Sequence, residues 1–276
     1  MAMPRFALTR AQLWGVALLA PFMVLAGGGS WLLGSSSGLQ AVVAILQRYS
    51  GGMLEIEGGE GRLLDAFSFD RVRLHGDGWR VGLRNVQIRW QPALLLQGEL
   101  QVLRLQVRQA EVVSLPSDAP LVLPDTLLLP LDIRLMQMEI GELWLSGSES
   151  SEPDLRIGAV QARYTADAVR HRLQVVHAAL PQGALAGTVD VVPQAPFAVQ
   201  ASATFDTQAP LHASYGATVQ GDLQHLEVVL DGAGEGMRLR GALQLLPLAQ
   251  SPLAGAHLAF SGVSPRWLVE DAPVAR

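Results

Sequence analysis

The sequence predicts a mainly β protein that begins with a transmembrane helix and a short amphipathic helix and continues as a long antiparallel sheet. Three observations support this prediction. Residues 13–33 carry no charge, residues 39–46 repeat apolar side chains with the period of a helix, and from Met53 onward apolar and polar residues alternate in short runs between turn residues. No helical period of ordinary length follows Tyr49, so the sheet has to form the body of the protein.

The uncharged segment, residues 13–33, is predicted to be a membrane anchor. A helix of that length spans about 30 Å, which is the thickness of the hydrocarbon core of a bilayer. Arg5 and Arg10 precede the segment and the next charge is Arg48, so residues 1–12 are expected in the cytoplasm and the rest of the chain across the membrane. The residues expected to hold the anchor in the bilayer are Trp14, Leu18, Phe22, Leu25 and Trp31.

A cleaved signal peptide is the alternative interpretation of the same segment. Ala26 and the three glycines after it offer a small-residue cleavage site. The apolar core of a signal peptide is usually about 7–15 residues long, which is shorter than this segment, so we prefer an uncleaved anchor. Under either interpretation, the rest of the chain is delivered across a membrane.

Composition argues against several classes of function. All twenty basic residues are arginine, so sites that need a lysine, such as a Walker A loop or a Schiff base, are impossible. The net charge of −5 argues against a nucleic-acid-binding protein, which normally carries a basic patch. The six histidines are scattered, and even His171 and His177 would stand roughly 20 Å apart on a strand, too far to share a zinc ion. We therefore expect no cofactor, no metal site and no enzymatic activity.

Residues 34–51 are predicted to contain the amphipathic helix. Apolar side chains recur from Leu39 to Leu46 at the spacing of one helical face, Ser36 or Ser37 caps the start, and the Gly-Gly pair that follows ends it. This short helix fits two locations equally well. It can lie on the membrane surface, or it can plug the end of a sheet.

Residues 52–276 are predicted to form the sheet. The clearest alternation runs from Trp79 to Leu83 and resumes after Asn85 as far as Trp90. Strands of this kind have one dry face and one wet face, which is typical of an antiparallel sheet that is half solvated. The adjacent apolar pair at residues 102–103 indicates a bulge that switches the faces.

A proline-interrupted loop is predicted near residues 114–130, and many short strands follow it. These strands are predicted at residues 131–145, 155–164, 171–178, 184–191, 197–205, 211–219, 223–231, 237–246 and 256–261. Beyond about ten strands an open sheet usually curls or splits, so this sheet has to close on itself, fold into a sandwich or curve into a trough. The sequence stops at Arg276 without a capping signal, and we expect the protein to continue beyond it.

The order of these features resembles the N-terminal region of the TamB family, within the wider AsmA-like group. The resemblance is clearest over residues 34–113. It is carried by the Ser-Ser-Ser-Gly-Leu stretch, the short helix after it, and the Trp-x-Pro-x-x-Leu-Leu-x-Gly-x-Leu passage from Trp90 to Leu100. The resemblance implies a periplasmic β-taco, which is a long curved sheet with an apolar groove, anchored in the inner membrane of a Gram-negative bacterium. The family's large C-terminal portion is missing here.

The resemblance implies a protein that helps phospholipid transport between the inner and outer membranes, with phospholipid acyl chains and the inner membrane as its partners. The alternative is an adaptor for outer-membrane protein or autotransporter assembly, acting with a TamA-like barrel through exposed strand edges. An outer-membrane β-barrel shares the alternation, but the uncharged segment and the lack of aromatic girdles argue against it. The residues predicted to line the groove are Trp79, Val81, Leu83, Val86, Ile88, Trp90, Leu100 and Val102.

Overall fold

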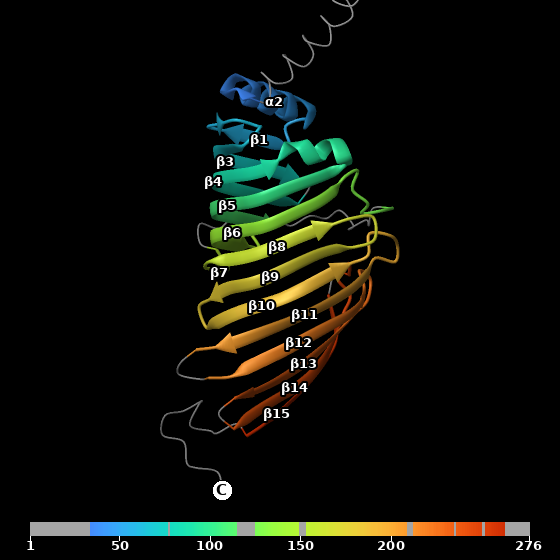
Figure 1. Cartoon of the computed structure of the whole chain (residues 1–276). Helices are drawn as coiled ribbons and strands as arrows, with labels where there is room; N and C mark the ends of the chain where they lie inside the picture. Colours follow the sequence, from blue (N-terminus) through green and yellow to red (C-terminus); the bar gives the residue numbers. More distant parts are fainter. Residues whose placement is uncertain are drawn as a thin grey trace, which may run out of the picture.

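The computed structural model describes residues 34–76, 78–114, 125–148, 153–208, 212–234, 236–249 and 252–262. These residues form one long sheet whose strands are stacked from a helix at one end to the last strand at the other (Figure 1). A mainly β fold with an open, curved sheet is therefore confirmed. The predicted anchor, residues 13–33, lies outside the described residues, and no helix within them is long and apolar enough to span a membrane.

The helices of the described ranges are α2 (Ser36–Tyr49) and the 3-10 helix η1 (Pro92–Gln97). The strands are β1 (Leu54–Glu57), β2 (Glu60–Gly61), β3 (Ala66–Gly76), β4 (Trp79–Gln91), β5 (Glu99–Ser114), β6 (Asp132–Ser146), β7 (Leu155–Ile157), β8 (Val160–Ala166), β9 (His171–Leu180), β10 (Gly183–Val191), β11 (Ala198–Thr207), β12 (Ser214–Asp222), β13 (Leu226–Gly234), β14 (Met237–Leu245) and β15 (Leu253–Ser261). Along the sheet the order is β1-β3-β4-β5-β6-β8 and then consecutive strands to β15, while β2 pairs with β3 and β7 pairs with β6.

Helix α2 forms where the sequence predicts it, with a start signal one residue earlier than expected. The N-cap is Ser35, whose side-chain oxygen accepts a hydrogen bond from the Gly38 N–H at 3.0 Å. Ser35 keeps an extended backbone, as an N-cap residue does, while the two serines after it are already helical. Beyond the helix, Gly51 and Gly52 have φ angles of 62° and 90°, in the left-handed region that glycine tolerates.

One pair of neighbouring strands, β5 and β6, is parallel, whereas the sequence predicts an antiparallel sheet throughout. Glu99, the first residue of β5, is paired with Asp132, the first residue of β6. The connection between the two strands therefore runs back along the length of β5 before β6 begins. The described part of this connection is tied to the turn between β10 and β11. The Leu127 N–H donates to the Pro193 carbonyl at 2.9 Å, and Thr126 forms an antiparallel bridge with Gln194.

Two further details of the strands can be compared with the prediction. The bulge at residues 102–103 is confirmed, because Arg89 pairs with Arg104 and Trp90 with Val102, which leaves Leu103 without a partner. The prediction of a single strand over residues 155–164 is wrong, because two strands, β7 and β8, form there and are separated at Gly158. The Gly158 N–H leaves the ladder of β6 and donates to the Ala179 carbonyl of β9 at 2.6 Å.

A line of unpaired residues crosses the first long strands of the sheet. The register has no partner for Asp70, Asn85, Arg108 or Gly141, which stand at the same level on β3, β4, β5 and β6. Asn85 has a φ of 50°, in the left-handed region. Because this line interrupts the alternation, apolar residues on both sides of it, such as Leu83 and Val86, face the same side. We call this line the crease.

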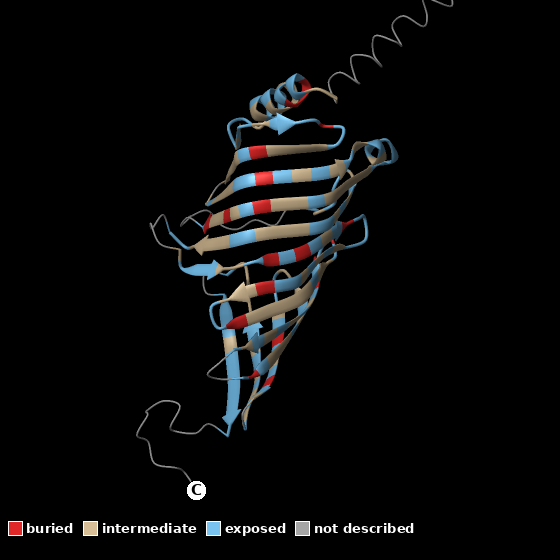
Figure 2. Cartoon of the chain, turned by 60° about the vertical axis from the view of Figure 1, so that its left-hand side comes forward, coloured by how far each residue is buried: buried red, intermediate tan, exposed pale blue. Residues whose placement is uncertain are grey.

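The buried core lies beside the crease, and α2 completes it. Leu39 of α2 is 1% exposed and forms a cluster with Leu63, Phe69, Val86, Val107 and Ala110. Val42 and Val43, one turn further along α2, also pack against this cluster. Figure 2 shows the helix at the end of the curved sheet. Helix α2 therefore plugs the end of the sheet through one of its faces.

Replacing Gly141 at the crease by alanine is expected to destabilise the protein by about 1–3 kcal/mol, because an added Cβ would overlap the backbone of the neighbouring strand and an overlap that forces the backbone to shift has a cost of that size. A Cβ atom at Gly141 would lie 2.6 Å from the backbone carbonyl oxygen of Arg108, which cannot move aside as a side chain would. Urea unfolding of the full chain measures the change. Gly216→Ala on β12 is the control, because the nearest atom there is 3.7 Å away. Equal stability of both variants would contradict the close approach of the β5 backbone to Gly141 at the crease.

Candidate functional site: the apolar face of the sheet

The pairing register shows which side chains share a face, because residues directly opposite each other on neighbouring strands project to the same side. Four sets of paired residues can be followed across the sheet, and we call them the apolar rows. The first row is Phe69, Val86, Val107, Ile140, Val160, Ala178, Leu185, Phe205, Tyr215, Gly232, Leu239 and Phe260. The second row is Phe67, Ile88, Leu105, Met138, Ala162, Val175, Gly187, Ala203, Ala217, Leu230, Gly241 and Leu258.

The other two rows begin on β4 and β5 and also end on β15. The third row is Trp90, Val102, Leu135, Tyr164, Leu173, Val189, Ala201, Val219, Val228, Leu243 and Ala256. The fourth row is Leu100, Ile133, Ala166, His171, Val191, Val199, Gly221, Leu226, Leu245 and Leu253. None of the four rows contains an aspartate, a glutamate or an arginine. One face of the sheet is therefore apolar from the plugged end to β15.

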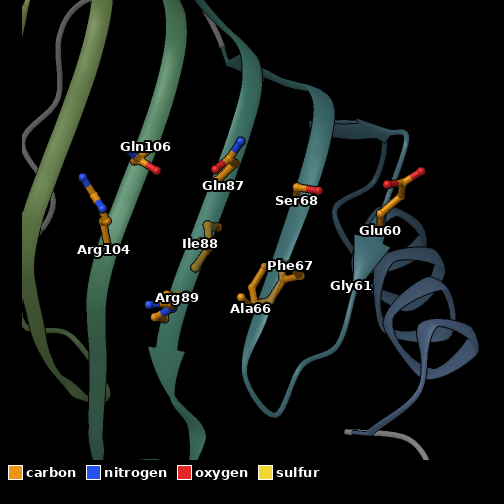
Figure 3. A pocket seen from close by; sticks show the side chains of 10 residues that line it. All are labelled: Glu60, Gly61, Ala66, Phe67, Ser68, Gln87, Ile88, Arg89, Arg104 and Gln106. Atoms are coloured by element: carbon orange, nitrogen blue, oxygen red, sulfur yellow. The ribbon is translucent and has the colours of Figure 1, made fainter.

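The opposite face of the sheet is polar. One of its rows is Ser68, Gln87, Gln106, Glu139, Gln161 and His177. Its first three members lie on neighbouring strands beside a shallow hollow of about 380 Å³, which is lined mainly by polar side chains (Figure 3). Several carboxylates on this face form ion pairs with arginine side chains, so part of its charge is compensated.

Glu139 and Asp190 illustrate this compensation. The Gln106 side-chain amide donates to Glu139 at 2.7 Å, and this bond, followed by the bond from Arg104, lowers the pKa of that carboxyl group below its usual value. Arg172 donates to both oxygens of Asp190 at 2.7 and 2.9 Å, and these bonds lower the pKa of Asp190. Both carboxylates stay ionised at neutral pH, and their stabilising contacts are lost only as the pH falls through the acidic range.

The apolar face is closed near α2 and only partly exposed further along. Val86 is 2% exposed beneath the helix, in the buried cluster. On the later strands exposure is mixed: Val189 is 37% exposed and Phe260 is 64% exposed. Six other members of the rows there are buried, namely Val160, Ala162, Ala166, Ala178, Val199 and Val228. All strands of the described residues belong to a single sheet, so no second sheet among them covers the apolar rows. Without such a layer, an apolar surface of this length favours an apolar occupant.

The structure places the eight predicted groove residues on one face of β4 and β5. Five of them, Val86, Ile88, Trp90, Leu100 and Val102, belong to the apolar rows. The other three, Trp79, Val81 and Leu83, lie on the same face beyond the crease. Leu83, Ile88 and Trp90 pack against the buried cluster, and the Trp90 indole N–H donates to the Leu63 carbonyl at 2.6 Å. The predicted residues therefore mark the closed end of the face, and their contact with a lipid stays a prediction.

The part of the face from β8 to β15 is absent from the predicted set of groove residues. Small residues such as Gly187, Ala201 and Ala203 occupy many of its positions, so its alternation is weak in the sequence. The polar residues of these strands could have indicated this part of the face. Threonine, serine and glutamine recur at every second residue there, so the residues between them share the other face. A pairing register cannot be obtained from that signal alone.

A polar spot interrupts the apolar rows on β8 and β9. The Tyr164 hydroxyl oxygen lies 3.4 Å from Nδ1 of His171, and burial raises the pKa of Tyr164 above its usual value. The other ring nitrogen of His171, Nε2, is buried without a hydrogen-bond partner among the described residues. No group of three or more metal-ligating side chains occurs in the described part of the chain.

No protein-family model matches this chain, and comparison with curated proteins and with solved structures finds no similar protein. The resemblance to the TamB family therefore stays a prediction.

Proposed function

We propose that the apolar rows carry phospholipid acyl chains and that the protein helps phospholipids pass between the inner and outer membranes of a Gram-negative bacterium. The observation that supports this proposal is the continuity of the rows across the pairing register. An acyl chain can move along a surface that is apolar over its whole length, because every position offers it the same kind of contact. A binding site for a single small molecule would instead need polar groups at defined places.

The energetics of an acyl chain suit this surface. Each CH₂ group removed from water contributes about 0.8 kcal/mol, so a whole acyl chain contributes on the order of 10 kcal/mol. Contact on one side only would give part of that amount, which is enough for retention and weak enough for movement. The phosphate headgroup would remain in water, away from the apolar rows, so the rows themselves need no charged residue.

The proposal places the protein in the inner membrane, with residues 13–33 as a single-pass anchor and the sheet in the periplasm. Arg5 and Arg10 on the near side and the uncharged segment after them support this topology. The plugged end of the sheet follows that segment directly, so the rows would lead away from the inner membrane.

The second candidate function is an adaptor for outer-membrane protein assembly. The observation in its favour is the free edge of β15, which pairs with β14 on one side only among the described strands. An unpaired edge can accept another strand by backbone hydrogen bonding. A partner of this kind, such as a TamA-like barrel, would bind the edge of the sheet and leave the apolar rows free.

Photo-crosslinking in living cells tests the lipid proposal. A photoreactive amino acid at Val189, which is 37% exposed in the third apolar row, is expected to capture phospholipid. The matched control is Val229, which is 55% exposed on the polar face of β13, opposite Thr218 and Ala242. Capture of protein alone at Val189, or equal lipid capture at both positions, would overturn the proposal.

A further inference from the structure

We propose that the second half of α2, together with Met53 just after it, is a docking surface for a lipid bilayer, which seats the plugged end of the sheet at the level of the lipid headgroups. The docking surface consists of Ile45, Leu46, Tyr49 and Met53. These four side chains are large and apolar, and between 48% and 86% of each is exposed. The proposal concerns the half of α2 that extends past the core; it rests on the inner-membrane anchor of the proposed function, but not on lipid in the apolar rows.

The helix has more apolar surface than the sheet covers. Leu39, Val42 and Val43 near its start are packed on the buried cluster. Leu46 is seven residues after Leu39, so it lies on nearly the same side of the helix, yet it is 48% exposed. The second half of α2 therefore extends past the core, and about half or more of each of its large apolar side chains, Ile45, Leu46 and Tyr49, stays exposed.

The chain that precedes α2 identifies the occupant as a bilayer. The uncharged residues 13–33 end immediately before Gly34, and a Cβ atom at Gly34 would lie 3.5 Å from the side chain of Leu64. The predicted anchor thus enters the structure at the same end of the sheet as the docking surface, which leaves little distance between that end and the membrane.

The charges of α2 suit the same occupant. The helix has no acidic residue, and its single charge is Arg48, in the last turn. Helices that lie in the interface of a bilayer bury an apolar face by about 5–10 Å and carry basic side chains on the polar face, and Arg48 supplies one such charge here. A helix in this position would fix the sheet relative to the membrane surface, beyond what a single anchor segment achieves.

Fluorescence quenching in vesicles tests the docking surface. The sequence contains no cysteine, so single-cysteine variants of the full chain can be labelled at one site with an environment-sensitive fluorophore. The test position is Tyr49→Cys. The control is Gln40→Cys, which is exposed on the opposite side of the same helix, because nine residues correspond to a rotation of about 180°. The full chain is reconstituted into vesicles of phosphatidylcholine and phosphatidylglycerol that contain lipids with a nitroxide near the headgroup.

The label at position 49 is expected to emit at shorter wavelength and to be quenched several-fold more strongly by the nitroxide lipids than the label at position 40. Equal quenching at both positions, or no quenching at either, would overturn the proposal. A shift to shorter wavelength at position 49 without quenching would place residues 13–33 or a second copy of the chain on this surface, and would overturn it as well. Lipid capture at Val189 is measured independently, so failure of the docking surface is distinguishable from failure of the lipid groove.

Discussion

Replacing Leu39 by aspartate is expected to detach α2 from the sheet and to destabilise the plugged end by at least about 3 kcal/mol. Leu39 is 1% exposed in the buried cluster, and loss of a leucine side chain from a core already costs about 2–5 kcal/mol. The aspartate adds the cost of burying a charge without a partner. Hydrogen exchange of the full chain in detergent should show faster exchange in α2 and in the first strands.

The effect should stay local, because each strand of this elongated sheet packs mainly on its neighbours. Exchange in β10 to β15 is therefore expected to change little. Gln40→Asp is the control, because Gln40 is an exposed residue of the same helix outside the docking surface, so a charge there stays in water. Equal effects of both substitutions would show that α2 does not plug the sheet through Leu39.

Replacing Val189 by aspartate is expected to reduce lipid binding more than tenfold without unfolding the protein. The substitution places a carboxylate in the third apolar row, where a passing acyl chain would have to remove water from it. Desolvation of a polar group without a partner costs at least about 2 kcal/mol, and about 1.4 kcal/mol already corresponds to a factor of ten. Because Val189 is 37% exposed, the charge remains hydrated while the groove is empty, so far-UV circular dichroism and thermal unfolding should change little.

The matched control for this prediction is Val229→Asp, the same substitution on the polar face of the sheet. Its charge would stand beside Thr218, outside the apolar rows. Unfolding of the Val189→Asp protein, with Val229→Asp unaffected, would instead indicate that something packs on the apolar face as in a sandwich core. That result would contradict an open groove.

Much of the fold could be predicted from the sequence, because local patterns determine it. The helical spacing from Leu39 to Leu46 gives α2, and the alternation from Trp79 to Trp90 gives β4. The adjacent pair at residues 102–103 gives the bulge on β5. These features depend on neighbours in the chain, so their period is visible without any knowledge of the register.

The features that could not be predicted depend on contacts between distant residues. The crease at Asn85 and Gly141 can be recognised only when the strands are aligned. Within one strand it is a single shift in the alternation of apolar and polar residues, which many strands have. The parallel pairing of β5 and β6 depends on the return of the connection between them, and no local pattern encodes its direction. The part of the candidate site from β8 to β15 was missed because alanine and glycine interrupt its larger apolar side chains, which weakens the apolar signal.

The lipid content of the purified full chain tests the open apolar groove most directly. The chain is purified from cells without added lipid, and phospholipids are counted per protein by mass spectrometry for the unsubstituted protein, Val189→Asp and Val229→Asp. If the groove is open and binds lipid, phospholipid is expected to co-purify with the unsubstituted protein and with Val229→Asp. The Val189→Asp protein is expected to lose most of its phospholipid while remaining folded. The same lipid content in all three proteins, or none in the unsubstituted protein, would contradict it.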